Sequence, residues 1–278
     1  MEKRLFTSEC VTCGHPDKVA DCISDAILDA CLAQDAGSRV ACETMVTTDF
    51  CVICGEITTK AVVDYETIAR RVIRQIGYTF PGSGFDADSV EILCKIHTQS
   101  ADIALGTNDE VGGAGDQGIM IGYACSETPE MLPLEVVLAR RLNQFIYAKF
   151  PYDGKTQVTL NPEGQLDSVV ASFQNAPKAE LEVLIKQFIA DKGLNEGAKI
   201  IANPAGDWNQ GGFEADTGLT GRKLIVDNYG PRIPIGGGCF SGKDATKVDR
   251  SAAYMARRVA VDYLKKRNAK EVFVRLAY

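Results

Sequence analysis

The strongest constraint on the fold is a helical pattern that occurs three times along the chain. The segments begin at Pro16, at Pro133 and near Thr246, at roughly equal intervals. Proline is favoured at the first position of a helix, and apolar residues three or four apart line one helix face. These apolar residues are Val19, Ile23, Ile27 and Cys31; Leu134, Leu138, Leu142 and Phe145 or Ile146; and Val248, Ala252, Ala256, Val259 and Tyr263. The sequence therefore predicts three core-facing helices.

Strand-like runs follow each of these helices. Residues 39–48 and 50–59 precede a helical run at 65–75, and residues 156–160 and 166–173 precede another at 178–190. After the third helix comes only 271–278, where Val272, Val274 and Leu276 alternate with polar residues, as in a half-buried strand. A third unit of equal size would need about a hundred more residues.

The resulting prediction is an α+β fold of three similar repeats, the third of them incomplete. We place the units at residues 1–100, 114–210 and 211–278. A last strand without its hairpin partner would expose backbone groups and an apolar face, and a lone strand is not stable in water. We therefore expect a partial sequence, or dependence on another chain.

The charge of the chain is acidic overall but locally basic. A formal net charge of -7 and a pI of about 5.0 argue against nucleic acid or an anionic membrane as a partner. The apolar runs are too short for a membrane span, and the N-terminus lacks a signal-peptide core, so we expect a cytoplasmic protein. A small anionic ligand is indicated by a cluster of cations: Arg222, Lys223, Lys243, Lys247 and Arg250.

Ten cysteines raise the alternative of a zinc or redox protein. Cys10 with Cys13, and Cys51 with Cys54, have the spacing of zinc ligands. The second pair lies in a strand-like run, however, and residues three apart on a strand point to opposite faces. Reduced, mostly buried thiols are therefore the favoured interpretation.

The first candidate for a catalytic motif is Gly14-His15-Pro16-Asp17-Lys18, at the opening of the first helix. The free N–H groups of a helix N-terminus attract anions, so His15 and Lys18 would face phosphate while Asp17 holds a metal ion. An equally good interpretation is a capped helix in which Asp17 is stabilised by the helix dipole.

Three glycine-containing segments are further candidates. Residues 236–244 include a Gly-x-x-x-x-Gly-Lys pattern ending in Lys243, but Asp244 stands where a P-loop has Ser or Thr, so an irregular phosphate-binding loop is favoured over a P-loop. Residues 113–118 place Asp116 on a small-residue loop, and residues 218–223 place two cations behind glycines. Each segment alone is also compatible with an ordinary turn.

Taken together and in this order, the four motifs closely resemble those of S-adenosylmethionine synthetases, and the similarity extends over residues 5–278. The resemblance implies three α+β domains about a pseudo-threefold axis, and homodimers or dimers of dimers with active sites between subunits. It also implies a transferase that joins ATP and L-methionine and hydrolyses the displaced triphosphate to phosphate and pyrophosphate. Two Mg²⁺ ions and K⁺ would be the cofactors.

The resemblance also implies roles for individual residues. Catalytic positions would be His15, Asp116, Lys243 and Lys247. ATP would be bound by His15, Asp153, Lys155, Trp208, Asp216, Arg222, Lys223, Cys239 and Lys243, and methionine by Glu56, Gln99, Asp216 and Lys247. Asp17 and Asp249 would bind Mg²⁺ and Glu43 would bind K⁺. Residues 99–109, with Gly106, would form a mobile loop that gates the site.

Three positions depart from the family pattern. Cys13 replaces a usual acidic residue, Ile235 a usual histidine, and Asp207 a usual arginine. At ~6 Å and an effective dielectric of ~20, each phosphate charge would repel the Asp207 carboxylate by roughly 3 kcal/mol. We therefore expect Asp207 to point away from the nucleotide. A non-catalytic fragment or subunit that binds ATP is the alternative function.

Overall fold

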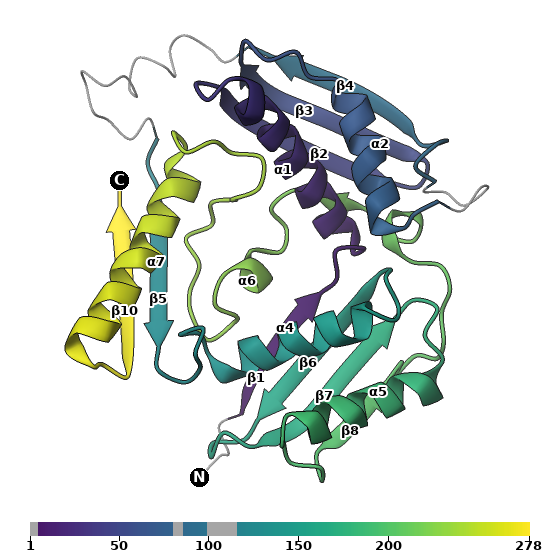
Figure 1. Ribbon diagram of the computed structural model, residues 1–278, viewed down its shortest axis with the longest axis vertical. Coiled ribbons are helices and arrows are strands. Elements are labelled where there is room, and N and C mark those ends of the chain that lie inside the picture. The colour runs from purple at the N-terminus through teal and green to yellow at the C-terminus, as the bar shows by residue number, and fades with distance from the viewer. Residues whose placement is uncertain (1–4, 80–85, 99–115) are drawn as a thin grey trace.

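The computed structural model describes residues 5–79, 86–98 and 116–278. Two units share one element order, helix, hairpin, helix, strand (Figure 1). The first holds α1 (Pro16–Gln34), β2 (Arg39–Thr47), β3 (Phe50–Thr58), α2 (Tyr65–Ile76) and β4 (Glu91–His97). The second holds α4 (Leu134–Tyr147), β6 (Gly154–Leu160), β7 (Leu166–Phe173), α5 (Lys178–Asp191) and β8 (Lys199–Ala202). The third holds α7 (Val248–Arg267) and β10 (Glu271–Ala277), which confirms three α+β repeats with an incomplete third.

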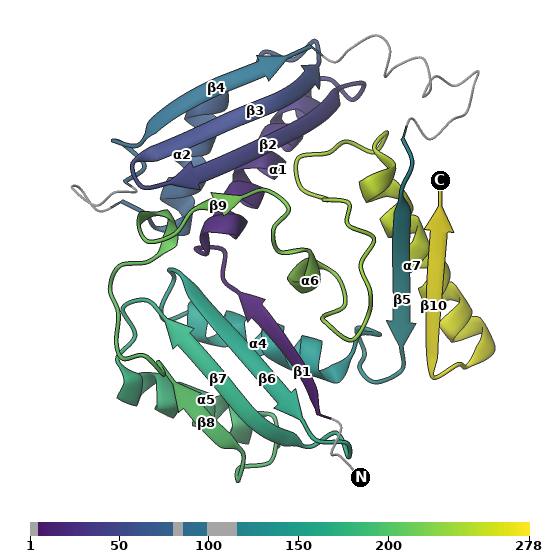
Figure 2. The ribbon, with the colours of Figure 1, turned by 180° about the vertical axis from the view of Figure 1, so that it is seen from behind.

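Each unit borrows a strand that precedes the helix of a different unit (Figure 2). β1 (Phe6–Val11) joins the sheet of the second unit, in the order β1-β6-β7-β8. β5 (Ile119–Cys125) pairs with β10 in the third, and β9 (Gly218–Leu219) completes the order β4-β3-β2-β9 in the first. The exchange is cyclic, so the three units are interlocked through backbone hydrogen bonds.

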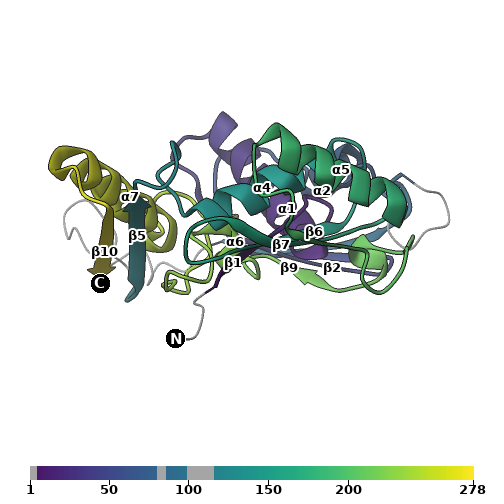
Figure 3. The same cartoon turned by 90° about the horizontal axis from the view of Figure 1, so that it is seen from below.

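Both four-stranded sheets have the same strand directions. The borrowed strand and the hairpin are antiparallel, whereas the last strand is parallel to its neighbour. The helices cover one face of each sheet, as Figure 3 shows for α4 and α5 above the second sheet. The other face of each four-stranded sheet is left without a covering helix within the described part of the chain.

The predicted core faces are correct for the first two repeat helices. Val19, Ile23, Ile27 and Cys31 are completely buried, and α4 buries Leu138, Leu142 and Ile146. In α7 the prediction was wrong for Tyr263, which is 52% exposed. This helix packs on only two strands, and its buried face is a narrower row formed by Ala252, Ala256, Ala260 and Leu264.

The last strand is half-buried, as its alternation predicted, but it is not alone. β10 pairs with β5 over its whole length, from Glu271 opposite Cys125 to Ala277 opposite Ile119. The expectation of an unpaired strand was therefore wrong, because it could not foresee the borrowed strand. No described strand lies along the other edge of β10. Among the helices the structure describes, none combines the length and apolarity needed to cross a membrane.

Candidate active site

The N-terminus of α1 lies at the centre of the candidate site. His15 caps this helix, with its Nδ1 accepting the N–H of Asp17 at 3.2 Å, and Pro16 takes the first helical position. The ring is buried, and burial together with the charges of Lys223 and Lys155 lowers the pKa of His15 to about 4. His15 is therefore neutral at pH 7, and its remaining proton is on Nε2.

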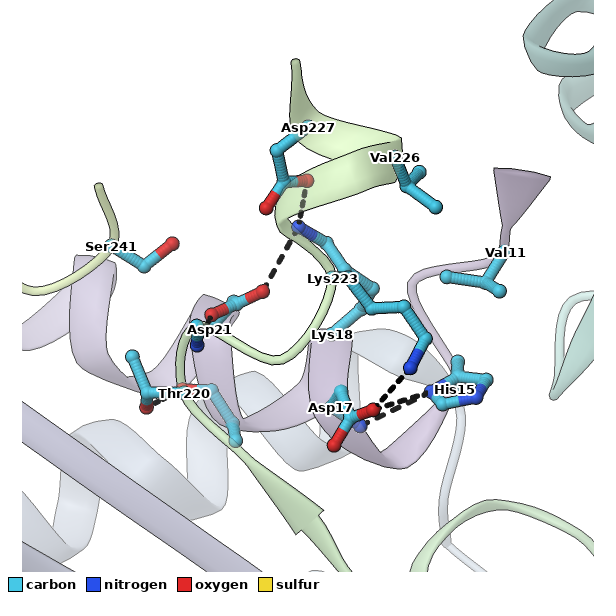
Figure 4. Close-up of polar contacts among 12 residues, drawn as sticks. Val11, His15, Asp17, Lys18, Asp21, Thr220, Lys223, Val226, Asp227 and Ser241 are labelled. Carbon is cyan, nitrogen blue, oxygen red and sulfur yellow. Dashed lines mark hydrogen bonds and ion pairs between the residues drawn. The ribbon is translucent and has the colours of Figure 1, made fainter. Parts of the chain in front are cut away.

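Asp17 is buried at the second position of the same helix (Figure 4). Its Oδ1 accepts the N–H of Leu219 at 3.0 Å and lies 3.7 Å from Nε of Arg222, while its Oδ2 forms an ion pair with Lys223. Burial by itself would raise the pKa of this carboxyl, but the hydrogen bonds from Lys223 and Leu219 lower it overall. Asp17 is consequently a carboxylate at neutral pH.

The three repeat helices share this arrangement of an acid and a cation. Each carries an acidic residue at its second position, where the helix dipole stabilises negative charge. Each acid pairs with a cation from the single connection between β9 and α7. The pairs are Asp17 with Lys223, Glu135 with Arg232 at 3.4 Å, and Asp249 with Lys243 at 2.5 Å.

The same connection is docked along an acidic row on α1. Asp17, Asp21 and Asp25 lie four residues apart and so share one helix face. They accept the backbone N–H groups of Leu219 at 3.0 Å, Gly221 at 2.9 Å and Gly242 at 3.0 Å, respectively. Sequence reasoning missed Asp21 and Asp25, although their fourfold spacing was a signal that could have identified them.

The glycine-rich loop that carries Lys243 is fastened to the edge of β2. Gly242 accepts the N–H of Cys42 at 2.9 Å, and Asp244 Oδ1 accepts that of Val40 at 2.7 Å. Gly242 has φ of 74°, in the left-handed region that glycine tolerates. A Cβ there would also lie 2.1 Å from the Cys42 oxygen, so the loop needs glycine at this position.

Three of the predicted residues, Asp153, Lys155 and Trp208, lie on or beside the second sheet. Asp153 is buried just before β6, where its Oδ2 accepts the N–H of Gly212 at 3.0 Å, and burial raises its pKa to about 6. Trp208 Nε1 donates to Ser172 Oγ at 3.0 Å, and Ser172 is the cross-strand partner of Lys155. Because Lys155 is close enough to lower the pKa of His15, this group borders the N-terminus of α1.

The comparison with known proteins decides the family. Residues 3–101, 111–208 and 210–278 match the models of the N-terminal, central and C-terminal domains of S-adenosylmethionine synthetase, respectively. The chain belongs to the S-adenosylmethionine synthetase family. The S-adenosylmethionine synthase of Pseudothermotoga lettingae is 48% identical over 99% of this chain and 78% of its own length. Those of Thermus thermophilus and Helicobacter hepaticus are 47% and 45% identical over 99% of this chain and 78% and 77% of their own lengths.

Two of the remaining residues that the family resemblance singled out, Cys239 and Asp216, lie near this centre. Cys239 packs against Gly221, where a Cβ would be 2.8 Å from its Sγ. Asp216 is exposed, and its charge affects the pKa of both His15 and Asp153. Lys247 occupies the N-cap position of α7, and its Nζ lies 3.4 Å from Oδ1 of Asp244. Asp116 is exposed just before β5.

The two predicted glutamates of the first sheet lie on its open face. Glu43 on β2 and Glu56 on β3 are both exposed there. Burial raises the pKa of Glu43, opposed by the charge of Lys243, so Glu43 is near the basic loop. Among the residues described, no hydrogen bond or ion pair joins Glu56 to His15 or Asp17. Gln99 and the predicted gating loop 99–109 are outside the described residues.

Two predictions about individual side chains have different outcomes. Lys18 does not face a phosphate site, because its ammonium lies between the carboxylates of Asp21 and Asp227. The Asp207 carboxylate lies at the start of α5, and its direction relative to a nucleotide stays a prediction. Its Oδ1 accepts the N–H of Lys178, the first residue of α5, at 2.9 Å, and so stabilises that helix N-terminus. The departure at this position therefore has a structural role.

The second cysteine pair has the geometry that the strand prediction required. Cys51 is buried beneath the helices, whereas Cys54 lies opposite Glu43 on the other face of the sheet. Cys10 is buried and Cys13 exposed, with burial raising the pKa of Cys10 to about 11. Groups of three or more possible metal ligands from His, Cys, Asp and Glu are absent from the described ranges.

Cys13 is expected to be the most reactive thiol of the described residues. A hydrogen bond from Cys22 lowers the pKa of Cys13, whereas burial raises that of Cys94, which is also exposed. Since the thiolate is the nucleophile, iodoacetamide at pH 7 should label Cys13 first, as peptide mass spectrometry would show. Replacing Cys22 by alanine should slow this labelling. Equal labelling rates for Cys13 and Cys94 would contradict the assignment.

The acidic residues at the helix N-termini suit Mg²⁺, which does not need a closed cage of protein ligands. Mg²⁺ keeps several waters and is commonly bound by one or two carboxylates plus the phosphates of a substrate. Asp17 and Asp249 each offer one carboxylate, and each is beside a lysine that can contact phosphate. This donor set suits an ion that arrives with a polyphosphate.

Proposed function

We propose that the protein forms S-adenosylmethionine from ATP and L-methionine and hydrolyses the displaced triphosphate to phosphate and pyrophosphate. The supporting observation is the convergence of Lys155 and Lys223 on the buried, neutral His15, with a second lysine–aspartate pair at the N-terminus of α7. This provides fixed positive charge for a highly anionic leaving group. Preorganised charge of this kind is a major source of catalysis.

In the proposed reaction, the methionine sulfur attacks C5′ of the ribose and the bond from C5′ to the triphosphate oxygen breaks. The sulfur becomes a sulfonium, and the negative charge moves to the triphosphate. Lys155, Arg222, Lys223 and Lys243 would hold that charge, and the Nε2–H of His15 would donate to a phosphate oxygen. Mg²⁺ bound at Asp17 and Asp249 would neutralise further phosphate charge.

The remaining roles are also proposals. Asp153 and Cys239 would contact ATP, with Trp208 stacked on the adenine. Asp116 would belong to the catalytic centre, and Glu43 would bind K⁺. Methionine would be held by Glu56, Gln99, Asp216 and Lys247.

We also propose a homodimer or a dimer of dimers with shared active sites. The open face of the first sheet carries an apolar row in which Leu219, Met45, Val52 and Leu93 are successive cross-strand partners. Leu219 is 37% and Leu93 40% exposed. Glu43 and Glu56 lie on the same face, so a second subunit would cover part of the methionine and K⁺ sites. The acidic net charge argues against nucleic acid and anionic membranes as partners, and we propose a cytoplasmic enzyme.

The test is to incubate the protein with ATP, methionine, Mg²⁺ and K⁺. Mass spectrometry should detect S-adenosylmethionine, and colorimetric assays should detect phosphate and pyrophosphate in equal amounts. Product release should require methionine, because the sulfur is the nucleophile. Hydrolysis of ATP at the same rate without methionine would count against the proposed reaction.

A non-catalytic ATP-binding subunit is the second candidate. It is favoured by one observation, namely that the third unit has a two-stranded sheet where the others have four strands. This candidate predicts ATP binding by calorimetry without any S-adenosylmethionine, and formation of the product by the purified chain would exclude it.

A further inference from the structure

Lys18 is a largely buried lysine that none of the proposed substrate contacts uses. Its Nζ lies 2.8 Å from Oδ1 of Asp227 and 3.0 Å from Oδ2 of Asp21 (Figure 4). Its side chain is 21% exposed, and those of Asp21 and Asp227 are 3% and 20% exposed. Burial by itself would lower the pKa of Lys18, but the two carboxylates raise it well above its usual value. The lysine is therefore permanently charged.

The three groups connect α1 to the short helix α6 (Leu224–Asp227). Lys223 immediately precedes α6 and pairs with Asp17 of α1, while Asp227, the last residue of α6, pairs with Lys18. Both ends of α6 are thereby attached to the first turns of α1. Arg140 of α4 also holds the end of α6, by donating to the carbonyls of Val226 at 2.6 Å and Asn228 at 2.7 Å. Lys18 is the contact that attaches this end of α6 to α1.

Asp21 adds a third attachment just before α6. Its Oδ1 accepts the N–H of Gly221 at 2.9 Å, which fixes the turn that leads into Arg222 and Lys223. Its Oδ2 accepts no hydrogen bond from the described residues and has only the ion pair with Lys18. Burial raises the pKa of Asp21 even in the presence of that lysine. The carboxylate therefore depends on the charge of Lys18.

We propose that Lys18 is a positioning residue of the transferase site. Its charge holds α6 and the preceding turn against α1, so that Arg222 and Lys223 are directed at Asp17 and at the polyphosphate beside it. Direct phosphate binding by Lys18 is the competing idea, but both neighbouring carboxylates occupy its ammonium. The role rests on the proposed function, because the site that Lys18 organises is the proposed ATP site.

Loss of the Lys18 charge should act through α6. Without it, two mostly buried carboxylates that share one cation would face each other unpaired, and like charges at short range repel. The Asp227 side chain would turn away from Asp21, and α6 would lose its attachment to α1 while Arg140 still holds its end to α4. Lys18→Met should therefore raise the KM for ATP about tenfold, a change of roughly 1.4 kcal/mol in binding, with little change in the KM for methionine.

The controls separate positioning from general stability. Lys149→Met removes a lysine that pairs with Glu180 at 2.7 Å on the surface, and it should change neither KM. Lys18→Arg keeps the charge and should restore most of the ATP affinity. A purely structural role would lower the melting temperature of Lys18→Met and leave the ratio of the two KM values unchanged, which would overturn the inference.

Hydrogen exchange followed by mass spectrometry tests the inference without activity. Peptides that cover residues 219–227 should exchange faster in Lys18→Met than in the wild type or Lys149→Met. If Lys18→Met does not fold, the same two measurements are made on Asp227→Asn. This variant removes the ion pair with α6 and leaves Lys18 paired with Asp21. Unchanged exchange and unchanged KM for ATP in a folded variant would overturn the role of Lys18. A wild-type protein that forms no S-adenosylmethionine would overturn only the proposed function.

Discussion

Replacing Lys223 by methionine is expected to lower kcat for S-adenosylmethionine formation by about 10²–10³-fold, the usual effect of removing one preorganised group that stabilises developing charge. Lys223 pairs with the buried Asp17 and acts on the pKa of His15, so it lies where the triphosphate would develop charge. Steady-state kinetics with both substrates varied is the measurement.

The same substitution should also destabilise the fold. Breaking a buried ion pair by removing one partner costs about 3–5 kcal/mol, because the other charge stays buried, and Asp17 is only 2% exposed. Urea unfolding would measure this loss. Lys186→Met, an exposed lysine on α5, is the matched control and should change neither property. A folded Lys223→Met protein with wild-type kcat would remove Lys223 from the proposed site.

Asp153→Asn is expected to stabilise the protein at pH 7.5. Burial raises the pKa of Asp153 to about 6, whereas an unfolded aspartate titrates near 3.9. The folded state therefore favours the protonated carboxyl, and stability falls as the pH rises from about 4 to about 6. Two units of pKa correspond to roughly 3 kcal/mol. Asparagine avoids the cost of a buried ionised carboxyl above pH 6. The stability gained by the substitution should therefore disappear near pH 4.

Urea unfolding of both proteins at pH 5 and pH 7.5 tests the sign as well as the size of this effect. The increase in the free energy of unfolding should be larger at pH 7.5 than at pH 5. An equal increase at both pH values would contradict the raised pKa of Asp153. Asp167→Asn, an exposed aspartate on β7, is the control and should give no such pH-dependent gain. Asp153 is a proposed ATP contact, so the stabilised variant should bind ATP more weakly. Such a trade-off between stability and function is common at functional sites.

Local periodicity predicted the elements that pack on their own neighbours. Both hairpins and their flanking helices lie within a few residues of the predicted bounds, because apolar spacing encodes which face is buried. The prediction was weaker for α7, whose core row consists largely of alanines that give little periodic contrast. It omitted β1, β4, β8 and β9, which were short or lacked clear alternation.

The candidate site was predicted in its residues and only partly in its arrangement. His15 and Asp17 stand in a compact motif at a helix start, and their cap geometry followed from that position. The i,i+3 pairing of Lys18 with Asp21 is local, but its second partner, Asp227, could not be predicted, because it is 209 residues away and no local pattern relates the two. From the sequence alone, a lysine on a helix face could equally well contact solvent, a phosphate or a buried carboxylate.

The sequence by itself thus determined three repeated α+β units and the acidic residue at the start of each helix, since helix periods and helix ends depend on neighbouring residues. Only the tertiary structure decided that the units exchange strands in a cycle, and that one connection brings a cation to each of those acids. Both features are pairings between residues far apart in the chain. Their free energy comes from backbone and charge contacts that exist only after the three units have come together.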